Sequence, residues 1–102
     1  MYLVQILLPL YDNEGAAFPA SHFRDVRDTL MARFGGMTAY TRAPAEGLWR
    51  EEGEGTTRDD IVIYEVMTDA LEDEWWRRWR AGLEARFSQD RIVIRAISSR
   101  LL

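Results

Sequence analysis

Three polar side chains stand inside runs of apolar residues that have the composition of β-strands. They are Gln5, Glu65 and Arg95. Because side chains alternate between the two faces of a strand, we predict that all three point to the same face of one sheet. A carboxylate and a guanidinium in a covered cavity would orient an anionic or hydrogen-bonding ligand, and the carboxylate could serve as a general base. The alternative is a polar pair that fixes the register between two copies of the protein.

Three further residues could contribute to the same cavity. Tyr40 and Arg42 share one face of a short predicted strand, and Trp49 lies in the long connection that follows it. Tyr40 and Arg42 could instead be ordinary polar residues of an edge strand. Trp49 could anchor its connection, contact a second copy or cover a ligand. The candidate ligand-binding residues are therefore Gln5, Tyr40, Arg42, Trp49, Glu65 and Arg95, and the sequence assigns no catalytic residue.

Several classes of chemistry lack the residue types that they need. The 102-residue chain has no cysteine, its 13 basic residues are all arginine, and His22 is its one histidine. These counts exclude thiolate nucleophiles, iron–sulfur clusters, lysine Schiff bases and multi-histidine metal sites. We therefore expect neither a metal nor a cofactor.

Charge and hydropathy also limit the partners. The net charge of −4 disfavours binding to nucleic acid or to an anionic membrane, which both require a basic surface. The first residues carry no positive charge, and their apolar run is too short to span a bilayer. We therefore expect a cytoplasmic protein whose first apolar run is a strand.

The periodicity of apolar residues divides the chain into six elements. Period-two runs predict strands, and steps of three and four predict helices. The expected strands are 2–8, 37–42, 61–67 and 91–98. The expected helices are 19–34 and a second one that Thr68 or Asp69 caps and whose apolar stripe reaches Phe87. Residues 43–57 form a long connection that could hold its own hairpin, with arms at 48–51 and 56–58. We expect residues 1–102 to form a single domain.

This order of elements predicts an α+β fold. Two strand–helix–strand halves in the order β-α-β-β-α-β form the ferredoxin-like arrangement, a split βαβ. Two right-handed crossovers would place both helices on one face of a four-stranded antiparallel sheet. The expected order across that sheet is the fourth, first, third and second strand of the chain.

The second helix is predicted to bury an aromatic stripe. Apolar residues recur at every fourth position, namely Leu71, Trp75, Trp79, Leu83 and Phe87. This spacing predicts that Trp79 lies at the centre of the buried face and that Trp76 lies at its margin. The neighbouring arginines fall outside the stripe, so the tryptophans are core residues and not a platform for stacking bases. In the first helix, Arg27 falls within the apolar arc, where an arginine normally extends toward an acidic neighbour.

Both faces of the predicted sheet are apolar. In the first strand Val4 and Ile6 take one face, while Leu3 and Leu7 take the other. One layer of helices covers a single face, and a solvated second face should be polar. We therefore expect that the open face is covered, and a second copy related by a two-fold axis is the simplest cover.

A chain with this order of elements and two apolar sheet faces resembles the dimeric α/β-barrel superfamily. That superfamily contains small monooxygenases, chlorite-dismutase-like proteins and muconolactone-isomerase-like enzymes. The segments 34–40, 46–50 and 60–66 also resemble an uncharacterised family of short bacterial proteins. The resemblance implies a ferredoxin-like homodimer, without haem, because the haem-binding members use a histidine and His22 is predicted at a helix start.

Three functions follow as hypotheses. The first is a small dimeric protein that binds a small molecule on the non-helical face of its sheet. The second is a non-enzymatic interaction or regulatory module whose sheet face serves only dimerisation. The third is a cofactor-free enzyme of the monooxygenase or isomerase kind.

Overall fold

Six elements follow one another in the order β-α-β-β-α-β. The computed structural model describes the backbone of residues 1–51 and 55–102, and the side chains of residues 1–41 and 60–102. The elements are β1 (Tyr2–Pro9), α1 (Ala20–Phe34), β2 (Thr38–Glu51), β3 (Gly55–Thr68), α2 (Asp73–Arg86) and β4 (Ile94–Ser98). Within these described parts, neither helix is long and apolar enough to cross a bilayer.

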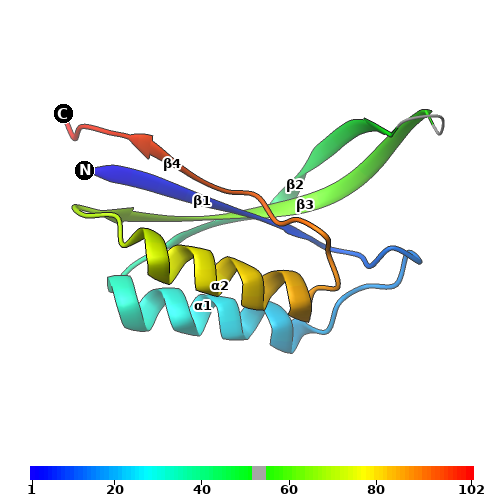
Figure 1. The fold of residues 1–102 in the computed structure, drawn as a ribbon, viewed down its shortest axis with the longest axis horizontal. Coiled ribbons are helices and arrows are strands. Elements are labelled where there is room, and N and C mark those ends of the chain that lie inside the picture. Colours follow the sequence, from blue (N-terminus) through cyan, green and yellow to red (C-terminus); the bar gives the residue numbers. More distant parts are fainter. Residues whose placement is uncertain (52–54) are drawn as a thin grey trace.

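The four strands form one antiparallel sheet in the order β2-β3-β1-β4. Both helices lie against one face of this sheet, and the opposite face carries no helix (Figure 1). The predicted ferredoxin-like α+β fold and the predicted order of strands are confirmed.

The core lies between the sheet and the helices. Every second residue of β1 points into it, so that Val4, Ile6 and Leu8 are almost completely buried. The rest of the core comes from β3, both helices and the residues that follow α2: Val26, Leu30, Val62, Tyr64, Val66, Trp76, Leu83, Phe87 and Ile92. No charged side chain in the described part of the chain is buried there.

Helix α1 ends where the sequence predicts. Gly35 adopts a left-handed conformation with φ of +76°, and its N–H donates to the carbonyl of Met31. Glycine reaches this conformation without the steric cost that a Cβ imposes. The helix turns Val26 and Leu30 toward the sheet, so that both are buried, whereas Met31 is 48% exposed.

Helix α2 differs from its prediction in start and in phase. The predicted cap at residue 68 or 69 is wrong, because the helix begins at Asp73. Trp76 is the buried tryptophan, only 8% exposed, whereas Trp75 and Trp79 are partly buried. The ring of Trp76 stacks on Phe34 of α1 at 5.3 Å between centroids. The placement of α2 against α1 and the sheet, which the spacing within α2 cannot reveal, decides which tryptophan enters the core.

Strands β2 and β3 extend through most of the segment predicted as a long connection. Leu48 pairs with Arg58 and Glu51 with Gly55, so the arms expected at 48–51 and 56–58 do pair as a hairpin. The pairing shifts register between Tyr40 and Ala45, which separates the hairpin from the inner part of the sheet. Figure 1 shows the two strands continuing past the helical layer.

Arg27 lies beside a buried tyrosine. Tyr64 of β3 is 1% exposed, and the charged side chain of Arg27 in α1 is close enough to act on its hydroxyl. Burial raises the pKa of Tyr64 above its usual 10.0, and the nearby guanidinium of Arg27 offsets part of that rise.

The raised pKa of Tyr64 predicts a loss of stability at alkaline pH. Above about pH 10 the unfolded chain releases the tyrosine proton while the folded chain retains it, so the free energy of unfolding falls as the pH rises. The contribution of the neutral Tyr64 side chain to the free energy of unfolding is fully present below the pKa that this tyrosine has in the unfolded chain. Denaturant midpoints should therefore fall less steeply at alkaline pH in Tyr64→Phe than in the wild type. Tyr11→Phe, which removes an exposed tyrosine, should leave this fall unchanged. Equal declines in the wild type and Tyr64→Phe would contradict this assignment.

Candidate functional site

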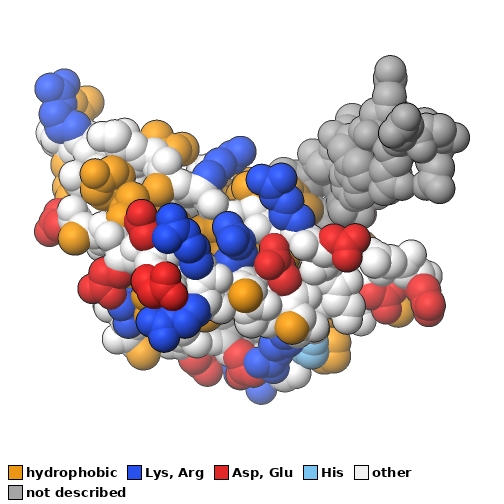
Figure 2. Space-filling view, viewed as in Figure 1, with side chains coloured by type: hydrophobic (Ala, Val, Ile, Leu, Met, Phe, Trp, Pro, Cys, Tyr) orange, Lys and Arg blue, Asp and Glu red, His pale blue; other side chains and the backbone are white. Residues whose placement is uncertain are grey.

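The open face of the sheet consists of one polar row between two apolar rows. On this face Leu3 and Gln5 of β1 each have a neighbour on β3 and another on β4, and Leu7 has a neighbour on β3 and another at Val93, just before β4. The apolar neighbours are Met67 and Ile97 beside Leu3, and Ile63 and Val93 beside Leu7. Met67, Ile97 and Val93 are between 40% and 46% exposed. Figure 2 shows apolar side chains gathered along the border of the molecule that lies away from the helices.

The polar row consists of Tyr40, Glu65, Gln5 and Arg95, and it crosses all four strands. Arg95 Nε donates to Gln5 Oε1 at 2.7 Å, and Gln5 Nε2 donates to Glu65 Oε1 at 2.7 Å. The Tyr40 hydroxyl donates to Glu65 Oε2 at 3.3 Å. The row is therefore a continuous chain of hydrogen bonds.

Gln5 is held in one orientation by its two neighbours. A guanidinium can only donate and an ionised carboxylate can only accept, so the amide oxygen must face Arg95 and the amide nitrogen must face Glu65. The register aligns these three residues in one row, as the alternation of their strands predicted, with Gln5 paired to both Glu65 and Arg95.

The row has a positive end and a negative end. Arg95 is exposed and uses its Nε toward Gln5, and among residues 1–41 and 60–102 no carboxylate forms an ion pair with it. The ion pairs of the helical layer, Arg33–Glu72, Arg78–Glu74 and Arg86–Asp25, lie elsewhere. The remaining N–H groups of Arg95 can bind an anionic or carbonyl group, and the carboxylate of Glu65 can accept a further donor.

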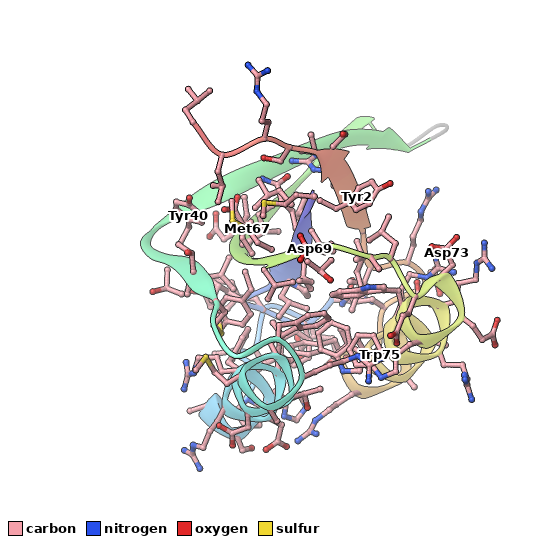
Figure 3. All side chains as sticks on the ribbon, turned by 90° about the vertical axis from the view of Figure 1, so that its left-hand side faces the viewer. Tyr2, Tyr40, Met67, Asp69, Asp73 and Trp75 are labelled. Carbon is pink, nitrogen blue, oxygen red and sulfur yellow. The ribbon has the colours of Figure 1, made fainter. Side chains whose placement is uncertain are left out.

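The structure brings together four of the six predicted residues. Tyr40 joins the row from β2, where its neighbour across the strand pair is Ile63, and its side chain is 51% exposed. Figure 3 shows Tyr40 and Met67 at the sheet, whereas Trp75 lies among the side chains between the helices. The side chains of Arg42 and Trp49 lie outside those that the structure describes.

His22 takes no part in this row. Its ring lies among Phe18 and Phe87 on the helical side, at 5.8 and 5.3 Å between centroids, and its Nδ1 is buried without a hydrogen-bond partner. Among the described residues, no group of three His, Cys, Asp or Glu side chains could hold a metal ion.

Sequence reasoning missed a hollow at the other side of the molecule. A space of about 330 Å³ lies where α1 ends and α2 begins, lined by Arg33, Phe34, Thr68, Ala70, Glu72 and Trp76. Arg33 and Glu72 form an ion pair beside it, and the Arg33 guanidinium lies 4.1 Å from the ring centroid of Trp75. These two charges are 39 positions apart, so no local pattern relates them.

Comparisons with known proteins identify similar folds but no family. No family model matches the chain, and no curated protein sequence matches it. A solved structure of a phage SAM lyase in complex with S-methyl-5′-thioadenosine is similar, with a TM-score of 0.59 and 14% sequence identity, over 95% of this chain and 80% of that chain. A phage SAM lyase in the apo state gives a TM-score of 0.58 and 10% identity, over 94% and 78%. At these identities the likeness shows the fold alone.

Proposed function

We propose that this protein binds a small polar molecule on the open face of its sheet, at the polar row. The observation that carries the proposal is the chain of hydrogen bonds from Arg95 through Gln5 to Glu65 and Tyr40, set within an apolar face. A few oriented polar groups on apolar walls are the usual composition of a small-molecule site. Arg95 would bind an acceptor group of the ligand, and Glu65 would bind a donor group.

We also propose that a second copy covers this face, as in the dimeric α/β-barrel proteins that the sequence resembles. Met67, Val93 and Ile97 leave exposed apolar side chains on both sides of the polar row in a single chain. The acidic net charge and the absence of cysteine support a cytoplasmic location for such a homodimer, and the sequence resemblance supports a bacterial source.

The structural neighbours support a nucleoside as the first ligand to test. The phage SAM lyase, which has a similar fold, was solved with S-methyl-5′-thioadenosine. A nucleoside presents both donors and acceptors on an apolar ring, which suits a polar row between apolar rows.

The ligand proposal predicts the effect of two variants on binding and on stability. S-adenosylmethionine and S-methyl-5′-thioadenosine are titrated calorimetrically into the wild type, Glu65→Gln and Arg95→Met. Each variant should weaken binding about tenfold or more, because one charge-assisted hydrogen bond is lost. The free energy of unfolding should change by only about 1 kcal/mol or less, because the remaining charge lines a wet ligand site and keeps its hydration. Asp28→Asn, on the exposed side of α1, is the matched control and should change neither quantity.

The same variants test the interaction module as the second candidate. The observation in its favour is that Gln5 already satisfies both of its neighbours, as a structural lock would. That function predicts that each single variant loses about 3–5 kcal/mol in the free energy of unfolding, because one buried charge would remain unpaired. The double variant removes both charges, so its loss should be much smaller than the sum of the two single losses. Unchanged nucleoside binding in both variants would contradict the site, and no binding of either nucleoside would contradict this ligand class.

A further inference from the structure

We infer that the two copies pack face to face about a two-fold axis parallel to β1, so that Arg95 of each copy faces the partner's Glu65. The inference rests on the homodimer proposed above and assigns its geometry. It makes the binding site composite: each site takes its guanidinium from one copy and its carboxylate from the other.

The two charges of the polar row lie on either side of the strand at its centre. Gln5 of β1 is at the centre of the polar row, with Glu65 one strand away on β3 and Arg95 one strand away on β4. Adjacent strands are about 4.8 Å apart, so the two charges lie about 5 Å to either side of Gln5. Among the residues whose side chains the structure describes, the polar row therefore carries one positive and one negative charge, placed symmetrically about β1.

When two identical faces pack together, the two-fold axis lies in the plane between them. We place this axis over Gln5, so that the two polar rows meet, and compare its possible directions. An axis parallel to β1 exchanges the two sides of that strand, which places Arg95 over the partner's Glu65. An axis perpendicular to the strands keeps the sides, which places Arg95 over Arg95 and Glu65 over Glu65. An axis at 45° crosses the strands at right angles and places each charge over the apolar rows.

Charge complementarity selects the first of these three directions. Like charges held between two sheets repel each other strongly, and a charge against apolar side chains loses its hydration without gaining a partner. Only the axis parallel to β1 gives both charges of each copy an opposite charge in the other. It also aligns the strands of the two sheets, which is the commoner way for sheets to stack.

The apolar rows match under the same operation. The axis places Ile97 of β4 over the partner's Met67, and Val93 over the partner's Ile63, with the sheets about 10 Å apart. Leu3 and Leu7 of the two copies meet along the axis, on either side of the two Gln5 side chains. Exposed apolar groups on β4 thus contact those on β3, so the interface is apolar around two composite polar sites.

The first test measures the mass of the particle and its response to charge reversal. Light scattering should give twice the mass of one chain for the wild type. Glu65→Arg should raise the dissociation constant of the dimer about tenfold or more, because Arg95 then faces an arginine. The double variant Glu65→Arg with Arg95→Glu should restore the dimer, since it exchanges the two charges. Asp28→Arg on α1 is the matched control and should leave the dissociation constant unchanged, and circular dichroism verifies that each variant is folded.

The second test determines the direction of the axis by cross-linking. The chain contains no cysteine, so an introduced thiol is the only one present. Ile97→Cys protein is mixed with Met67→Cys protein, or with Val93→Cys protein as the control, and each mixture is treated with a bis-maleimide that spans about 10 Å. The inferred axis predicts a 97–67 product about fivefold or more above the 97–93 product, because residue 93 of the partner lies about 13 Å farther along the strands. Mass spectrometry identifies the linked residues.

The outcomes separate the dimer from its axis and from ligand binding. A dimer that yields the 97–93 product overturns the inferred axis and leaves the proposed dimer standing. A monomer, or a trimer, overturns the proposed dimer and the axis together, and a monomer leaves the face open to a different partner. Nucleoside binding by a wild type that is a monomer supports the ligand site and overturns its composite nature.

Discussion

Trp76→Ala should lower the free energy of unfolding by about 3–5 kcal/mol, the cost typical of removing a large aromatic side chain from a core. Trp76 is 8% exposed and joins the two helices, because its ring stacks on Phe34 and contacts Trp75 and Trp79 edge to face at 4.9 and 5.6 Å. The cavity left by the removed ring would border the hollow at the end of α1, which Trp76 lines. Urea denaturation followed by circular dichroism measures the loss.

Trp79→Ala is the matched control, since it removes the same side chain from the same helix. Trp79 is only partly buried, so the loss should be clearly smaller than that of Trp76→Ala. The spacing of apolar residues in the sequence predicts the opposite order, with Trp79 at the centre of the buried face. A larger loss in Trp79→Ala would therefore contradict the phase that the structure gives to α2.

Phe87→Ala should also destabilise the protein by about 3–5 kcal/mol. Phe87 is fully buried directly after α2, and its ring packs edge to face against Phe18 at 4.9 Å and Phe23 at 5.5 Å. These contacts join the segment before α1 to the end of α2, so their loss should loosen the end of the helical layer that lies opposite Trp76. Hydrogen exchange should show the largest gain in the first turns of α1.

Phe87→Leu separates the loss of volume from a change in the fold. Leucine retains most of the buried apolar area, so this variant should lose much less stability than Phe87→Ala. Phe18→Ala removes a half-buried ring from the same cluster and should have an intermediate effect. A loss below about 1 kcal/mol in Phe87→Ala would show that this cluster does not join the two segments.

Much of the candidate site could be predicted because a strand has a fixed period. Alternation alone places Gln5, Glu65 and Arg95 on the face opposite Val4 and Tyr64, whatever the rest of the chain does. The apolar character of both faces likewise follows from the strand sequences. The contact between Tyr40 and Glu65 could not be predicted in the same way, because it depends on the pairing of β2 with β3.

The sequence by itself determined the order of elements, the face of each strand residue and the end of α1 at Gly35, because each depends on local geometry: side-chain period, apolar patterning or a left-handed backbone. Tertiary structure decided the phase of α2, where Trp75, Trp76 and Trp79 are all apolar and only their different burial in the folded chain distinguishes them. It also decided the pairing of Arg33 with Glu72 and the hydrogen bonds that join the polar row. These contacts are between residues far apart in the chain, so they depend on how helices and strands are placed in space.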